Sequence, residues 1–120
     1  MIVLIAAALI AAPQTESYAE IQARVSSEVA RAERQMDWQF QLTLKRLRNC
    51  RANSVKCYYW NKAVPRLQRE QAAWKQWRDA KADLDAVEME GTSGEAEVRS
   101  YSKIKMTKAR TAELSKIGRE

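Results

Sequence analysis

Apolar residues recur at steps of three and four in the first half of the chain, the spacing of one helix face. Between Tyr18 and about Arg48 there is no glycine or proline to interrupt a helix. The positions that share this spacing are Ile21, Val25, Val29, Ala32, Met36, Phe40, Leu44 and Leu47. The pattern therefore predicts a long first helix over these residues.

A second helix is expected from about Pro65 to Glu90, because proline suits the first turn of a helix. Its expected apolar stripe is formed by Leu67, Trp74, Trp77, Leu84 and Val87, with Ala73 and Ala80 beside it. We favour the two tryptophans as core residues. The alternative is that they form an exposed surface for a partner.

The stretch GTSG ends the second helix. Gly91 suits a left-handed C-cap position, and Thr92 or Ser93 can cap the next helix. A third helix is expected from about Glu95 to Ile117. Three helices joined by short turns predict an all-α fold, a three-helix up-down-up hairpin bundle.

The chain opens with an unbroken apolar run of eleven residues, Ile2 to Ala12. About 20 residues are needed to span a bilayer, so the run is too short for a transmembrane helix. It matches the apolar region of a secretory signal peptide, and Ser17-Tyr18-Ala19 offers a small-x-small cleavage site. The alternative is a buried helix start. We predict a signal peptide over residues 1–19, a single helical domain over 20–120, and a periplasmic or secreted protein.

Export would explain the two cysteines, Cys50 and Cys57, since an oxidising compartment lets them pair. In a continuous helix they would lie about 10 Å apart along the axis. A disulfide needs Cα atoms roughly 4.4–6.8 Å apart, so the bond requires a turn between them. We expect that turn, with Tyr58, Tyr59 and Trp60 after it in an extended stretch. The alternative is two free thiols in a cytosolic helix.

Positive charge is concentrated around this turn. Residues 42–81 carry a net charge of +9, whereas residues 13–41 carry −2 and residues 82–120 carry −1. Such a patch attracts anionic envelope surfaces or acidic proteins, and export argues against nucleic acid as the natural ligand. The alternative is a solvated face that only adjusts solubility. The candidate partner-binding residues are Arg48, Arg51, Lys56, Tyr58, Tyr59 and Trp60.

Several kinds of catalytic site find no support. The chain has no histidine, so the usual general base and the commonest metal ligand are missing. Two cysteines cannot build a zinc site alone, and no glycine-rich phosphate loop or GxSxG is present. We therefore predict a protein that is not an enzyme, with no metal site and no cofactor.

The second and third expected helices contain the stretches LQREQAAWKQWRDAKAD and MTKARTAEL, separated by GTSG. In these stretches the chain resembles the LprI-type lysozyme inhibitors, a family of small exported bacterial helical domains. An earlier stretch, QMDWQF, resembles the family more weakly through Met36, Asp37 and Phe40. The resemblance implies a protein that binds or inhibits lysozyme or another cell-wall hydrolase. The motif residues are Leu67, Gln71, Trp74, Trp77, Arg78, Asp79, Gly91, Gly94, Thr107, Arg110 and Leu114.

The family's cysteine pair is absent: Ala82 and Ser102 stand in those places, so packing must hold the third helix. We favour Arg78 and Arg110 as a hydrogen-bonded brace between helices over a role in binding, because a partly buried guanidinium needs such partners. For binding a hydrolase, the turn between the cysteines is the candidate segment to enter the cleft.

Overall fold

The computed structural model describes residues 15–50 and 55–119. They form α1 (Tyr18–Arg48), α2 (Val55–Asp85), a short 3-10 helix η1 (Val87–Met89) and α3 (Glu95–Lys116). The predicted all-α three-helix bundle is confirmed. None of the helices in the described residues is long and apolar enough to cross a membrane. Arg51 and most of the predicted signal peptide, residues 1–14, lie outside the described residues.

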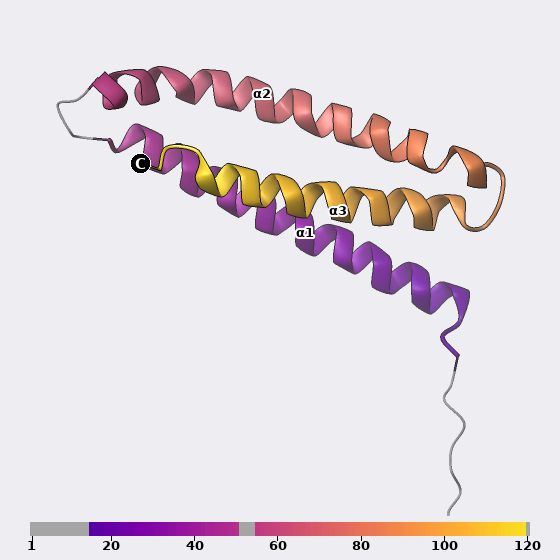
Figure 1. The fold of residues 1–120 in the computed structure, drawn as a ribbon. Coiled ribbons are helices and arrows are strands. Elements are labelled where there is room, and N and C mark those ends of the chain that lie inside the picture. The colour runs from indigo at the N-terminus through magenta and orange to yellow at the C-terminus, as the bar shows by residue number, and fades with distance from the viewer. Residues whose placement is uncertain (1–14, 51–54, 120) are drawn as a thin grey trace, which may run out of the picture.

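Figure 1 shows how the helices are arranged. α1 and α3 run in the same direction, and α2 runs antiparallel to both. α1 and α3 share the most extensive contact. The C-terminal ends of α1 and α3 therefore lie beside the N-terminal end of α2, and this end of the bundle carries the residues discussed below.

The first helix begins and ends as the apolar spacing predicts. Ser17 is its N-cap, and the Ser17 hydroxyl accepts a hydrogen bond from the Glu20 N–H at 3.2 Å. The buried residues of this face include Val25, Met36 and Leu47. The periodicity of one apolar face was therefore sufficient to place α1.

The second helix begins ten residues earlier than expected. Pro65 lies inside α2 and not in its first turn, and Tyr58, Tyr59 and Trp60 are helical and not extended. A proline in a helix interior removes one backbone hydrogen bond. Packing overrides this cost, because Val64 and Leu67 on either side of Pro65 are buried in the core. The predicted end at Glu90 was also late, since α2 ends at Asp85 and η1 follows.

The predicted apolar stripe of α2 was wrong at three positions. Trp77 is 54% exposed, Leu84 63% and Val87 56%. Trp74 is half-buried and packs against the core. The face that α2 buries is partly polar instead, and its members are Cys57, Val64, Leu67, Gln71, Arg78 and Ala82.

The turn between η1 and α3 agrees with its sequence in one respect and differs in another. Gly91 has φ +76°, the left-handed conformation expected at this position. The N-cap of α3 is Gly94, without a side-chain cap, and not Thr92 or Ser93. The Thr92 hydroxyl instead accepts from the Gly94 N–H at 3.3 Å, and the Ser93 carbonyl accepts from the Tyr18 hydroxyl at 2.7 Å. The Thr92 side chain therefore stabilises the turn itself, and the Ser93 backbone carbonyl ties the turn to α1.

Candidate functional site

A disulfide joins the end of α1 to the start of α2. Cys50 follows the α1 C-cap Asn49, and Cys57 lies in the first turn of α2. Their Cα atoms are 5.3 Å apart. The predicted disulfide is present, and it holds the start of α2 beside the end of α1.

Exposed basic and aromatic side chains surround this bond, and we call Arg48, Cys50, Lys56, Cys57 and Tyr58 the disulfide end. Arg48 and Lys56 are exposed, and Tyr58 is 58% exposed. The Tyr58 ring packs against Tyr59 edge to face at 5.4 Å, and the Lys62 ammonium lies 4.4 Å from the Tyr58 ring centroid. Trp60, by contrast, is half-buried against the core and presents little surface.

Six cations of this half of the bundle have no carboxylate partner among the described residues. None of the following six has a carboxylate oxygen within 4.0 Å in the part of the chain that the structure describes: Lys45, Arg48, Lys56, Lys62, Arg66 and Arg69. At the opposite end of the bundle lie exposed acids, among them Glu20, Glu88 and Glu90. The molecule is therefore electrically polar along its length, with a positive end at the disulfide.

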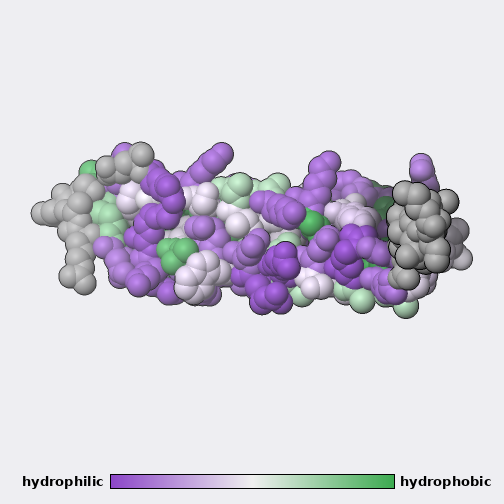
Figure 2. Space-filling view, turned by 90° about the horizontal axis from the view of Figure 1, so that it is seen from below, coloured by the Kyte–Doolittle hydropathy of each residue, from purple (hydrophilic) through white to green (hydrophobic). Residues whose placement is uncertain are grey.

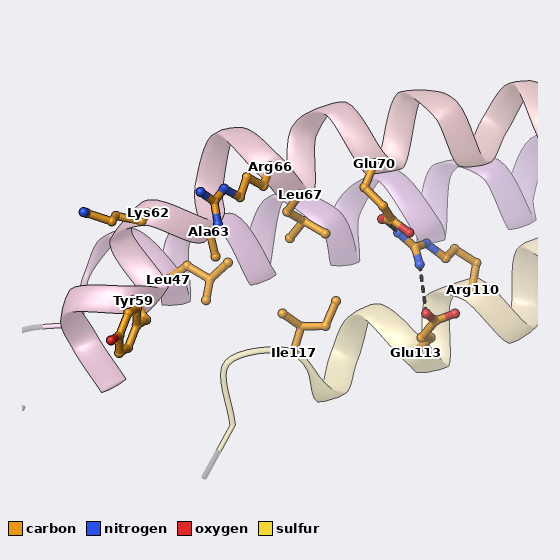
Figure 3. Close-up of a pocket in the computed structure, with 10 residues that line it drawn as sticks. All are labelled: Leu47, Tyr59, Lys62, Ala63, Arg66, Leu67, Glu70, Arg110, Glu113 and Ile117. Carbon is orange, nitrogen blue, oxygen red and sulfur yellow. Dashed lines mark hydrogen bonds and ion pairs between the residues drawn. The ribbon is translucent and has the colours of Figure 1, made fainter. Parts of the chain in front are cut away.

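A groove with a volume of about 560 Å³ opens between α2 and α3 near this positive end. Figure 3 shows apolar side chains in its middle, with Lys62 and Arg66 at one end and a carboxylate–guanidinium cluster at the other. The sequence did not reveal this groove, because it requires α2 to begin at Val55. Its lining is Leu47 from α1; Tyr59, Lys62, Ala63, Arg66, Leu67 and Glu70 from α2; Arg110 and Glu113 from α3; and Ile117, which follows α3.

Arg110 closes one end of the groove and ties α3 to α2. It is 2% exposed, and its Nε donates to the Gln71 Oε1 at 2.9 Å. Its other nitrogens pair with Glu70 of α2 and, at 3.0 Å, with Glu113 of α3. Gln71 is itself buried, and its Nε2 has no hydrogen-bond partner in the described residues.

Arg78 ties α2 to both other helices. Its side chain is 8% exposed and pairs with Glu33 of α1, with Asp79 at 3.0 Å, and with the Thr107 hydroxyl of α3 at 3.3 Å. The half-buried Trp74 lies between the two arginines, with each guanidinium carbon 5.5 Å from its ring centroid. The polar motif residues thus meet in the centre of the bundle and not on one open surface.

Beside this cluster, Lys75 of α2 reaches α1. The Lys75 ammonium donates to Asp37 at 2.9 Å and lies 3.3 Å from Glu33. The hydrogen bond to Asp37 raises the pKa of Lys75, more than its partial burial lowers it. These ion pairs join α2 to α1.

Seen from below, the molecule shows a mostly hydrophilic face with scattered hydrophobic residues (Figure 2). In residues 15–50 and 55–119 there is no group of three or more acidic or cysteine side chains that could hold a metal ion.

Comparison with known protein families gives one match. Residues 10–114 match the family described as "Lysozyme inhibitor LprI". The comparisons with curated proteins and with solved structures returned no match. The family match covers most of the chain, including all three helices except the last two residues of α3. The chain therefore belongs to the LprI lysozyme inhibitor family.

Proposed function

We propose that this chain is an exported, non-enzymatic protein that binds lysozyme or another cell-wall hydrolase and inhibits it. The observation that carries the proposal is the family match over residues 10–114. The Cys50–Cys57 disulfide supports export, because such bonds form and persist in oxidising compartments. We accordingly propose a periplasmic or secreted location, with residues 1–19 as the signal peptide.

We propose the disulfide end as the surface that meets the hydrolase. Enzymes that hydrolyse glycosides generally use two carboxyl groups in a cleft, and a cationic projection is complementary to such a cleft. Arg48 and Lys56 are exposed and have no carboxylate partner in the described residues. The disulfide joins Cys50 to Cys57, so Arg48 and Lys56 are held near each other before the partner binds. Arg51, within this turn, is expected to contribute to the same contact.

Salt distinguishes contact in a cleft from attraction at a distance. The chain has a net charge of +6, and common animal-type lysozymes are also cationic, so the two repel at long range. Screening at higher salt weakens this repulsion and leaves short-range contacts largely intact. Inhibition should therefore persist, or develop faster, at physiological salt than at low salt.

The test is lysozyme-driven clearing of a cell-wall suspension, with and without the purified protein, at low and physiological salt. We expect the protein to slow clearing at both. Lys56→Glu should weaken inhibition severalfold, whereas Lys108→Glu, an exposed position on α3 with the same charge change, should not. If the folded protein does not slow clearing by any hydrolase tried, inhibition as the function is wrong.

The second candidate is attachment to an anionic envelope surface. It is favoured by the six cations without carboxylate partners and by the exposed rings of Tyr58 and Tyr59 near them. Surface attraction of this kind is screened by salt. Co-sedimentation with vesicles rich in anionic lipid should occur at low salt and be lost in high salt. Binding to neutral vesicles alone would contradict this candidate.

A further inference from the structure

The groove between α2 and α3 has an apolar floor built by all three helices. Leu47 of α1 is 1% exposed, Leu67 of α2 is 9% exposed, and Ile117 follows the end of α3. Ala63 lies beside them, and its small side chain leaves room in the groove (Figure 3). A volume of about 560 Å³ lies within the range of small-molecule sites, which are concave and mostly apolar.

The two ends of this groove differ in charge. Lys62 and Arg66 are exposed at one end, and neither has a carboxylate within 4.0 Å in the described part of the chain. At the other end, Glu70 and Glu113 share the single guanidinium of Arg110, so this cluster carries one net negative charge. An anion is therefore attracted to the Lys62 end and repelled from the Glu113 end.

We propose that this groove binds a single-chain anionic amphiphile, such as a fatty acid carboxylate. The anionic head lies against Lys62 and Arg66, and the alkyl chain lies on Leu47, Leu67 and Ile117. A protein partner fits the groove less well, since stable protein interfaces bury on the order of 1,000 Å² or more and a groove of this size suits a small molecule. The inference does not depend on the inhibition of a hydrolase, which we assign to the disulfide end.

Isothermal titration calorimetry with dodecanoate, below the concentration at which it forms micelles, tests this proposal. We expect one molecule to bind per chain. Butyrate, which has the same head and a short chain, should bind at least tenfold more weakly because it covers little of the apolar floor. Dodecyltrimethylammonium has a cationic head group and tests whether the sign of the charge matters. Dodecyl maltoside has an uncharged head group and tests whether a charge is needed. Both should bind more weakly than dodecanoate.

Matched variants separate the groove from general electrostatic attraction. Lys62→Glu combined with Arg66→Glu should weaken dodecanoate binding by roughly tenfold, the combined effect expected for two exposed ion pairs. Lys45→Glu combined with Arg69→Glu makes the same change in net charge at exposed positions outside the groove, and should leave the affinity within about twofold. Circular dichroism confirms that both double variants stay helical.

Three results would overturn the proposal: no binding of dodecanoate to the folded protein, equal or tighter binding of the cationic amphiphile, or an equal loss of affinity in the two double variants. The last would indicate attraction by net charge alone. Cell-wall clearing is measured with the same variants. A failure of dodecanoate binding can then be distinguished from a failure of the proposed inhibition.

Discussion

Replacing Arg110 by methionine removes a buried guanidinium and keeps much of the volume of the side chain. Arg110 is 2% exposed and makes its most buried contact through Nε, which donates to Gln71 Oε1 at 2.9 Å. Its other two partners are the carboxylates of Glu70 and Glu113. The substitution therefore tests whether this polar centre stabilises the packing of α3 on α2.

The magnitude follows from the exposure of the three partners. The side chains of Glu70 and Glu113 are 55% and 64% exposed, so water replaces the guanidinium and the loss is about 0–1 kcal/mol. Gln71 is 3% exposed and its Nε2 already lacks a partner, so losing the Oε1 bond costs about 1–3 kcal/mol. The guanidinium over Trp74 adds about 0.5–1 kcal/mol. The expected loss in the free energy of unfolding is the sum of these contributions, roughly 1.5–5 kcal/mol.

Urea unfolding followed by far-ultraviolet circular dichroism measures this loss, with the disulfide kept oxidised. Arg99→Met is the matched control. Arg99 also bonds two carboxylates, Asp83 at 3.0 Å and Glu95 at 2.7 Å, but its side chain is 33% exposed. Its replacement should cost less than about 1 kcal/mol, because exposed ion pairs contribute little.

A double variant isolates the bond between Arg110 and Gln71. When Gln71→Leu is added to Arg110→Met, both partners of the buried bond are replaced by apolar groups and no buried amide is left unpaired. The double variant should therefore lose less stability than the two single losses added together. The reasoning is refuted if Arg110→Met costs no more than Arg99→Met, or if the two single losses simply add.

Four further predictions follow from particular contacts. Reducing the Cys50–Cys57 disulfide should lower the free energy of unfolding by about 2–3 kcal/mol, because the closed loop restricts the unfolded chain; equal urea midpoints for both forms would contradict this. Pro65→Ala should stabilise the protein by up to about 3 kcal/mol, since it restores a backbone donor inside α2, and a lower urea midpoint would disprove it. Trp77→Ala should change stability by less than about 1 kcal/mol because the ring is 54% exposed, whereas Trp74→Ala should cost clearly more by the same assay. The hydrogen bond from Lys81 lowers the pKa of Asp85, so this carboxylate stabilises the fold above its unfolded pKa and the effect is lost as pH falls through the lower folded pKa; Asp85→Asn should remove this part of the acid destabilisation, measured as the free energy of unfolding against pH.

The first and third helices could be predicted because their signals are local. The apolar spacing from Ile21 to Leu47 places one face of α1, and Gly91 marks the turn that precedes α3. These features depend on a few neighbouring residues and on the conformations that glycine permits. The number of helices and their up-down-up order can be predicted from the apolar spacing and from the positions of the turns.

The second helix could not be placed by hydrophobicity because it buries polar groups. Gln71 and Arg78 occupy core positions, where they hydrogen-bond across helices, while the larger apolar ring of Trp77 faces solvent. A stripe of Leu67, Gln71, Arg78 and Ala82 has helical spacing, yet only two of its four members are apolar. A partly polar buried face can be recognised only when its hydrogen-bond partners on the other helices are known. A single sequence does not show which residues of different helices lie close together. The motif resemblance did point to three of these residues, because it weighs positions and not hydrophobicity.

The groove between α2 and α3 could not be predicted from the sequence, for a related reason. A proline at position 65 indicates a helix start, so the stretch before it, Tyr58 to Trp60, is predicted to be extended. In the structure Val64 is buried and Trp60 packs against the core, so both hold the preceding turns of α2 in place. Only with those turns present do Tyr59 and Lys62 come beside Ile117 of α3.

Side-chain hydrogen bonds hold α3 at both of its ends. Near its start, Ser102 donates a hydrogen bond to Asp85 of α2 at 3.1 Å. At the far end, Arg46 of α1 donates to the carbonyls of Ser115 at 3.2 Å and Ile117 at 2.8 Å, which the last turn of α3 leaves without helical partners. The Cys50–Cys57 disulfide joins α1 to α2. α3 is held by its packing in the core, which includes Leu114, and by side-chain hydrogen bonds at both of its ends. Ile117 also forms part of the apolar floor of the groove. The hydrogen bonds from Arg46 therefore hold both the end of α3 and this part of the proposed amphiphile site in place.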